Sequence, residues 1–181
     1  MIQRRLLLET AKYNVETVTS RNSDGSVASR AIIRHPGSVI VLPILGSGAD
    51  RQVVLIRNFR ITLERTIVEL PAGTRAKPDA NGRQETPEVC AARELGEETG
   101  YRAGSLKYLT SWLTAPGLTD EVMHFFLATD LTHVGQHLEP DETIQPYFVT
   151  VDRAIEMVGA GEITDAKTIL ALLWARRAGV L

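Results

Sequence analysis

Four carboxylates and one arginine lie close together in the middle of the chain, at spacings that suit metal binding. If the segment is helical, Glu94, Glu97 and Glu98 fall within an arc of about 100°, at about 100° per residue. Like charges at these spacings repel each other by roughly 0.2–0.5 kcal/mol per pair. Arg93, one turn before Glu97, neutralises part of this charge, and Glu85 precedes it by eight residues. Carboxylates crowded in this way indicate a site for a divalent cation.

The segment that carries these residues is predicted to be a helix on independent grounds. Thr86 is a suitable N-cap, and Pro87 suits the first helical position, where its missing N–H costs nothing. Gly100 suits the left-handed position just past the helix end. The helix is therefore expected to present an acidic polar face. The apolar residues expected on the opposite side are Val89, Ala92 and Leu95.

The spacing of these residues resembles the sequence box of the Nudix hydrolases. Glu85 is followed after seven residues by Arg-Glu-Leu-Gly-Glu-Glu-Thr-Gly-Tyr at 93–101, and Glu-Leu-Pro-Ala-Gly at 69–73 is similar to the usual lead-in. The family normally has five residues between the box glycine and the first glutamate, whereas eleven separate Gly73 from Glu85. The insert, residues 74–84, is rich in turn-forming residues and is predicted to be an enlarged polar loop of open role.

The resemblance implies a role for each member of the cluster. Glu94 and Glu98 would be the direct metal ligands, with Glu97 next and the Ala72 carbonyl adding a backbone oxygen. Mg²⁺ is the implied ion, because it prefers carboxylate oxygen, water and substrate phosphates, and Mn²⁺ is the alternative. Arg93 would hold Glu97 and the first box glutamate in place rather than contact substrate. The catalytic residues are therefore expected to include Glu97, Glu98 and Arg93.

A general base is expected from the acidic loop 139–142. Enzymes that resemble this chain carry a catalytic glutamate on a mobile loop in this region. Glu142, just before the last expected strand, is favoured, and Glu139, nearer the loop tip, is the alternative. The base must reach the attacking water, so its position in the fold decides between the two.

Four further residues are candidates for substrate binding. Pro116 lies sixteen residues after Gly100 in Ala-Pro-Gly-Leu-Thr-Asp-Glu, which is similar to a segment of ADP-ribose pyrophosphatases. Arg57 and Arg60 resemble the arginine segment that precedes the box in ADP-sugar hydrolases. Arg60 is the preferred phosphate contact, because a guanidinium forms a bidentate fork. Arg30 is a second candidate, in a position that could serve a partner subunit.

The surrounding elements predict a mixed α/β (α+β) fold, and the resemblance implies a Nudix-type α/β/α sandwich with a mixed sheet. Residues 1–36 are expected to form an antiparallel β extension, and residues 37–181 the hydrolase domain. In the resembled group, the N-terminal part packs across a two-fold axis, which implies a homodimer. The expected strands are 13–18, 27–33, 38–45, 52–60, 66–70, 106–113, 122–129 and 144–151, and the expected C-terminal helices are 152–158 and 165–178, capped by Asp152 and Asp165.

The composition excludes several classes of protein. A net charge near −2 gives no basic field for nucleic acid and no patch for a membrane surface. The apolar run 6–8 is too short for a signal peptide or a membrane span. Cys90 is the single cysteine, which excludes an internal disulfide and suits a reducing compartment. A cytoplasmic protein is therefore expected.

Taken together, the box and the arginine segments favour one activity over two alternatives. The expected reaction is Mg²⁺-dependent hydrolysis of ADP-ribose, or of a related ADP-sugar, to AMP and a sugar phosphate. GDP-mannose is the alternative substrate, because residues 54–60, 124–126 and 161–168 are similar to segments of GDP-mannose pyrophosphatases. A non-catalytic module that binds nucleotide sugars is the third reading. The presence of all four box glutamates favours an enzyme instead.

Overall fold

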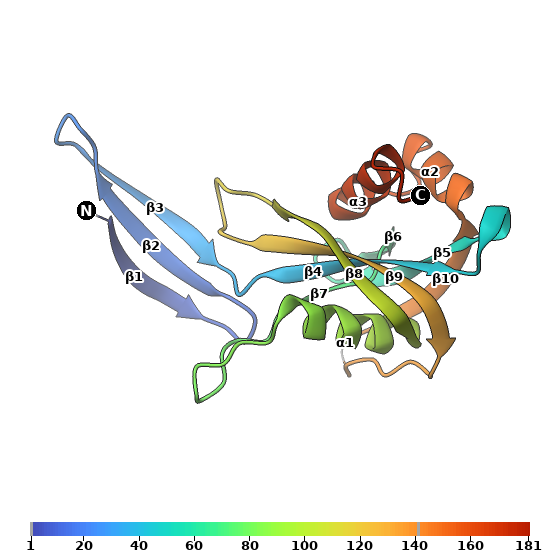
Figure 1. Cartoon of the computed structure of the whole chain (residues 1–181). Helices are drawn as coiled ribbons and strands as arrows, with labels where there is room; N and C mark the ends of the chain where they lie inside the picture. The colour runs from blue at the N-terminus through green and yellow to red at the C-terminus, as the bar shows by residue number, and fades with distance from the viewer. Residues whose placement is uncertain (1, 141) are drawn as a thin grey trace.

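The computed structural model describes residues 2–140 and 142–181, which form two β-sheets and three α-helices. A small sheet is built from the N-terminal strands, and a seven-stranded sheet forms the body of the molecule. Figure 1 shows the small sheet projecting away from the body and from the C-terminal helices. The small sheet contains β1 (Ile2–Glu9), β2 (Asn14–Arg21) and β3 (Val27–Arg34); the large sheet contains β4 (Ser38–Leu45), β5 (Gln52–Arg60), β6 (Arg65–Glu69), β7 (Ala72–Thr74), β8 (Tyr101–Leu113), β9 (Val122–His133) and β10 (Ile144–Thr150); the helices are α1 (Pro87–Thr99), α2 (Val151–Gly159) and α3 (Ala166–Arg177).

The large sheet is mixed, and β4 lies near its centre. The main strand order is β10-β5-β4-β9-β8, with β6 paired to β5 and β7 paired to β4. β4 and β9 run parallel, whereas the other neighbouring pairs are antiparallel. Because both faces of β4 are covered, its sequence is almost continuously apolar, and Val39, Ile40, Val41 and Leu42 are fully buried. The short strand β7 lies beside β4, close to α1.

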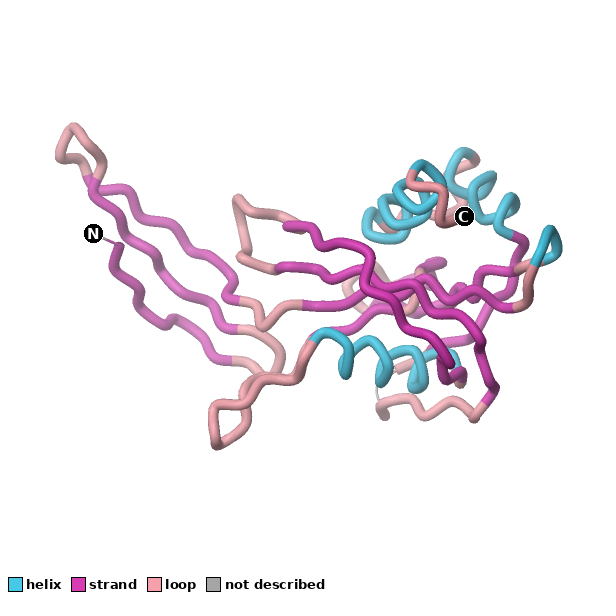
Figure 2. Tube along the Cα trace, in the orientation of Figure 1, coloured by secondary structure: helices cyan, strands magenta, loops and turns pink. Residues whose placement is uncertain are grey.

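Two hydrophobic cores flank the large sheet. Figures 1 and 2 show α1 on one face, and α2 with α3 on the other. Phe125 and Phe126 are adjacent on β9, and their side chains enter different cores because successive strand residues point to opposite faces. Phe125 packs with Leu172 of α3, and Phe126 packs with Leu95 of α1. The predicted α/β/α sandwich with a mixed sheet is confirmed.

The ends of α1 are as predicted, but its buried face is so only in part: Leu95 is buried as expected. The Thr86 side chain accepts a hydrogen bond from the Val89 N–H, and Gly100 adopts the left-handed conformation with φ 74°. Val89 is exposed, however, whereas Glu94 and Glu98 are buried. The predicted acidic face is therefore partly buried, because α1 packs against β4, β7 and β8 with the side that carries these two glutamates.

Two further differences concern the N-terminal sheet and α2. The sheet has three strands where sequence predicted a hairpin, because β1 also forms. Its register shifts between Leu6 and Leu8, and this bulge removes the regular alternation that marks a strand. The N-cap of α2 is Thr150 rather than Asp152, since the Thr150 side chain accepts the Arg153 N–H. Asp165 caps α3 as predicted.

Candidate active site

Two buried carboxylates form the centre of the site. Glu94 and Glu98 lie one helical turn apart on α1, and they are 8% and 3% exposed. The Ala72 N–H on β7 donates a hydrogen bond of 2.8 Å to Oε2 of Glu98. The carbonyl of Ala72 is an expected metal ligand, and that role stays a prediction. Gly73 lies directly against the Glu94 carboxylate. The lead-in and the helix are therefore brought together as the box spacing predicted.

Arg93 connects three carboxylates. Its Nε and Nη2 donate to Glu85 at 2.9 and 3.1 Å, and its Nη1 lies 2.9 Å from Glu97 and 2.8 Å from Glu94. The hydrogen bonds to Glu85, followed by the nearby glutamate charges, raise the pKa of the Arg93 guanidinium. The same bond to Arg93 lowers the pKa of Glu85. The predicted contacts of Arg93 with Glu85 and Glu97 are confirmed.

Burial opposes negative charge on the two central glutamates. It raises the pKa of Glu94 to about 7, although Arg93 partly offsets the effect. It raises the pKa of Glu98 to about 8, against the hydrogen bond from Ala72. The charge of Glu142 also contributes to both raised pKa values. A cation beside the two carboxylates would favour their ionised forms.

The donor set fits a cation that keeps part of its hydration shell. Among residues 2–140 and 142–181, no three acidic, histidine or cysteine side chains form a ready metal cage. Mg²⁺ is usually bound by one or two carboxylates, with water and substrate phosphates completing its octahedron. Glu94 and Glu98 match that requirement, because each is buried and each is held from one side by Arg93 or by the Ala72 N–H.

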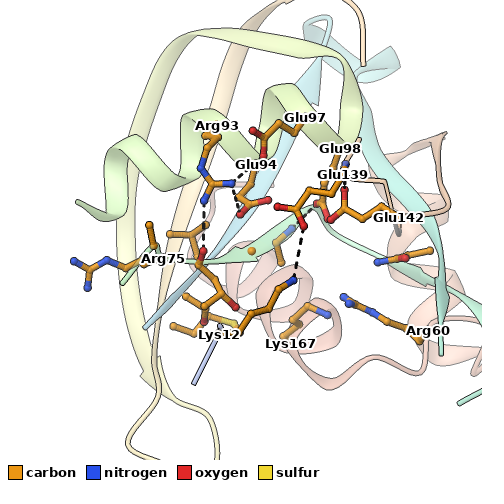
Figure 3. Close-up of a pocket in the computed structure, with 18 of the residues that line it drawn as sticks. Lys12, Arg60, Arg75, Arg93, Glu94, Glu97, Glu98, Glu139, Glu142 and Lys167 are labelled. Carbon is orange, nitrogen blue, oxygen red and sulfur yellow. Dashed lines mark hydrogen bonds and ion pairs between the residues drawn. The ribbon is translucent and has the colours of Figure 1, made fainter. Parts of the chain in front are cut away.

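These residues line a cleft of about 960 Å³ that also contains a set of cations. Figure 3 shows the glutamates of α1 on one side, facing Lys12, Lys167 and Arg60 on the other. Negative and positive groups thus line opposite walls of the same cleft. Such a cleft suits a substrate whose phosphates bind both a metal ion and protein cations.

The cationic wall is organised by a buried glutamate. Glu69 is 1% exposed, and its two oxygens accept from Nε and Nη2 of Arg60 at 2.9 and 3.0 Å. Lys167 also forms an ion pair with Glu69 and a second one with Asp165 at 3.0 Å. Arg60 was predicted from sequence, whereas Lys167 was not selected. Its position in the first turn of α3 was a usable signal, because a cation there opposes the helix dipole and needs acidic neighbours.

The loop between β9 and β10 brings both candidate bases to the cleft. Glu139 and Glu142 line it, and Oε2 of Glu142 accepts the Glu139 N–H at 3.0 Å. Gln136 fastens the loop to α1, because its Nε2 donates to the Glu98 carbonyl at 2.6 Å. Residue 141 of the predicted acidic loop lies outside the described residues. The loop therefore lies in the same cleft as Glu94 and Glu98.

Three of the predicted substrate contacts lie away from the cleft of this chain. Arg57 is exposed, and its guanidinium lies over the Tyr147 ring, with Cζ 4.1 Å from the ring centre. It points away from Arg60 because residues three apart on a strand face opposite sides. Arg30 lies on β3 of the small sheet, and Pro116 lies on the exposed β8–β9 loop. None of the three is among the cleft-lining residues in the described part of the chain.

The chain is similar in sequence to several known proteins. A model of the NUDIX domain matches residues 34–172. The chain is 40% identical over 151 residues to an ADP-ribose pyrophosphatase of Bacillus subtilis, covering 82% of this chain and 77% of that protein. It is 36% identical over 163 residues to a methanol dehydrogenase activator of Bacillus methanolicus, covering 89% and 82%. It is 31% identical over 165 residues to a GDP-mannose pyrophosphatase of Salmonella typhimurium, covering 86% and 81%.

A solved structure shares the fold. The crystal structure of an ADP compounds hydrolase superposes with a TM-score of 0.78, over 100% of this chain and 96% of that chain. Its sequence is only 20% identical, so this similarity is one of fold. The N-terminal sheet and the sandwich are both included in the matched length.

Proposed function

The chain belongs to the Nudix family, and on that premise we propose that it hydrolyses the pyrophosphate bond of ADP-ribose, or of a related ADP-sugar, to AMP and a sugar phosphate. One observation carries the proposal: the buried pair Glu94 and Glu98 faces a cleft whose other wall holds Arg60 and Lys167. A nucleoside diphosphate sugar carries its negative charge in the middle of the molecule. Such a cleft therefore receives the reacting bond between its acidic and basic walls.

We propose Mg²⁺ as the metal, with Mn²⁺ as the alternative, and Glu94 and Glu98 as its carboxylate ligands. Glu97 and the Ala72 carbonyl are the further ligand candidates. When bound, the ion supplies neutralisation of the phosphate oxygens and acidification of the attacking water. Arg93 holds the Glu85 and Glu97 carboxylates in a fixed orientation.

Glu142 is the preferred general base, and Glu139 is the alternative. Both line the cleft, but the charge of Glu142 contributes to the raised pKa values of Glu94 and Glu98. This coupling supports Glu142, because the base must take a proton from a water held beside those carboxylates. The Glu139 carboxylate faces Lys12 instead, with 4.0 Å between Oε2 and Nζ.

The substrate phosphates are assigned to Arg60, with Lys167 beside it. Glu69 accepts from Nε and Nη2 of Arg60, which leaves Nη1 as a further donor on the same guanidinium. Because a buried carboxylate fixes both cations, their charges are held in place before substrate arrives. This preorganisation favours phosphate binding in the cleft.

A homodimer is part of the proposal. The small sheet exposes large apolar side chains, among them Ile2, Leu6 and Leu8. Apolar side chains gathered in this way mark an interaction surface, and a second copy of the sheet is the proposed cover. Arg30 lies on this sheet, so we assign it to the cleft of the partner subunit. Pro116 lies on the loop that meets β3, where the Ile33 N–H donates to the Leu118 carbonyl at 2.9 Å.

GDP-mannose is the second candidate substrate, supported by the relatives named GDP-mannose pyrophosphatase at about 30% identity. The ADP-ribose pyrophosphatase of B. subtilis is more similar, at 40%, and supports the first choice. A purely binding module is disfavoured, because Glu85, Glu94, Glu97 and Glu98 are all present. We place the enzyme in the cytoplasm on the basis of its single cysteine. No helix in residues 2–140 and 142–181 has the length and apolar character of a membrane span.

The test is hydrolysis of ADP-ribose and of GDP-mannose, side by side, with Mg²⁺ and with EDTA. Separation of the products by chromatography is expected to show AMP and ribose 5-phosphate from ADP-ribose with Mg²⁺, and no products with EDTA. Faster turnover of GDP-mannose would contradict the substrate assignment but keep the chemistry. No turnover of either compound, with either one still stabilising the protein against heat, would contradict the enzyme assignment.

A further inference from the structure

The tip of the turn between β1 and β2 lies in the active-site cleft. Ala11 and Lys12 form this tip, and both line the cleft. The turn is closed by its own hydrogen bonds, because the Thr10 N–H donates to the Tyr13 carbonyl at 3.0 Å. The Tyr13 N–H donates back to Oγ1 of Thr10 at 3.0 Å. A turn fixed at both sides presents its tip in a defined direction.

The insert 74–84 holds this turn from outside. Nζ of Lys77 donates to the Thr10 carbonyl on one side of the turn and to Oδ1 of Asn14 on the other, the latter at 2.9 Å. The base of the insert is fastened in turn, because Nε and Nη2 of Arg75 donate to the Glu85 carbonyl at 2.9 and 2.6 Å. Glu85 is itself bonded to Arg93, so the insert connects the turn to the middle of α1.

Lys12 faces the cleft with a partner that is easily replaced. Its Nζ lies 4.0 Å from Oε2 of Glu139, and the two side chains are 66% and 54% exposed. Exposed ion pairs of this kind contribute little to stability. Figure 3 shows Lys12 reaching toward Glu139 from the wall opposite α1. A phosphate oxygen that enters the cleft can therefore take the place of the Glu139 carboxylate.

We propose that Lys12 is a substrate-binding residue that contacts the diphosphate, and that the insert exists to hold it there through Lys77. This inference rests on the proposed function, since it assigns a further contact for the same substrate class. It also gives the enlarged loop a role: the insert extends from the box to the N-terminal turn of its own chain. Lys12 acts on the cleft of the subunit that carries it.

The test is the dissociation constant of inorganic pyrophosphate with Mg²⁺, measured by titration calorimetry at low and at moderate salt. Lys12→Ala is expected to weaken binding by about 10-fold, the loss of one charge-assisted contact, and to reduce its salt dependence. Lys12→Arg is expected to retain most of the affinity. Lys77→Met is expected to weaken binding as Lys12→Ala does, because the turn loses its outside support.

A double variant and a matched control test whether Lys77 affects pyrophosphate binding through Lys12. Lys12→Ala combined with Lys77→Met is expected to bind as Lys12→Ala alone, because Lys77 acts through Lys12. Arg83→Ala removes an exposed cation from the same insert and is expected to bind as the wild type does. Full affinity in Lys12→Ala, independent losses in the double variant, or no pyrophosphate binding by the wild type would overturn the proposal.

ADP-ribose hydrolysis by the wild type is measured in parallel, because it separates the two claims. A Lys12-dependent affinity for pyrophosphate without ADP-ribose turnover refutes the proposed function and keeps the Lys12 contact. Turnover of ADP-ribose by the wild type, with pyrophosphate affinity unchanged in Lys12→Ala, supports the proposed function and refutes the Lys12 contact.

Discussion

The carboxylate of Glu94 occupies the space that a side chain on Gly73 would need. A Cβ atom built on Gly73 would lie 1.9 Å from Cδ and from Oε1 of Glu94, far inside any permitted contact. Gly73 is therefore required by the close approach of a functional group rather than by its own backbone conformation. This contact explains why the box glycine precedes the insert, at the end of the lead-in, and not within the loop.

Gly73→Ala is expected to displace Glu94 while leaving the fold intact. A displacement of about 1 Å at a catalytic group lowers kcat by about 100-fold. Steady-state kinetics with Mg²⁺ measures the effect, and a thermal melt checks the fold. Gly159→Ala is the matched control, because a Cβ at Gly159 would have no neighbour within 4 Å. Equal kcat values for Gly73→Ala and the wild type would refute the role of this contact.

Arg93→Lys tests the hub that joins Glu85, Glu94 and Glu97. An ammonium cannot reproduce the planar fork that contacts all three carboxylates at 2.8 to 3.1 Å. Loss of such an orienting partner typically lowers metal affinity or activity by 10–100-fold, so we expect about a 30-fold higher Mg²⁺ requirement. A titration of activity against Mg²⁺ measures it. An unchanged half-saturation point would mean that Arg93 does not orient the ligands.

Glu69→Gln is expected to raise KM for the substrate and to lower stability. The amide keeps the size of the side chain but removes the charge that holds Arg60 and Lys167. Breaking a buried pair costs about 3–5 kcal/mol, and the partial exposure of Arg60 reduces the expected cost to about 2 kcal/mol. Kinetics and denaturant unfolding measure the two effects. Glu156→Gln on the surface of α2 is the control, and similar results for both variants would contradict the assignment.

Metal-free protein is expected to lose stability as pH rises from about 5 to about 8. The pKa of Glu98 is raised by burial to about 8, above its ordinary value of 4.5. The folded state then binds more protons than the unfolded state throughout this window, so the free energy of unfolding falls with increasing pH. Glu94, with a pKa of about 7, contributes the same sign up to that pH.

Thermal melts in EDTA, compared between wild type and Glu98→Gln, isolate this effect from other titrating groups. The melting temperature of the wild type is expected to fall relative to that of the variant by several degrees across the window. Added Mg²⁺ is expected to restore the wild type most strongly near pH 8, where both carboxylates are needed in ionised form. A difference in melting temperature between the two proteins that stays constant at all pH values would show that burial does not raise the pKa of Glu98.

Local sequence rules predicted the helix that carries the chemistry. Thr86 and Gly100 set its ends through a side-chain cap and a left-handed residue, and both depend on near neighbours. The same rules did not predict which face is buried, because Glu94 and Glu98 turn toward β7 as part of the site. Hydrophobicity favoured burial of Val89, which is 58% exposed. The packing of Glu94 and Glu98 against the sheet therefore outweighs the apolar pattern at Val89, whereas Leu95 follows that pattern and is buried.

The features of the site that sequence did not predict depend on contacts between distant segments. Glu69 and Lys167 are 98 residues apart, so their pairing depends on how α3 docks on the sheet. Lys12 enters the cleft because Lys77, in the insert predicted to be a polar loop, holds the β1–β2 turn. Arg57 and Arg60 are three residues apart on β5, so strand alternation alone directs their side chains to opposite faces.

The central claim is that Glu98 is a metal ligand of a pyrophosphatase. The most direct test compares kcat for ADP-ribose between wild type and Glu98→Gln, with Mg²⁺ and with EDTA, after thermal melts confirm that both proteins are folded. The variant is expected to lose turnover by about 1,000-fold or more, to remain folded and to respond no longer to Mg²⁺. A folded Glu98→Gln protein with Mg²⁺-dependent turnover equal to that of the wild type would contradict it.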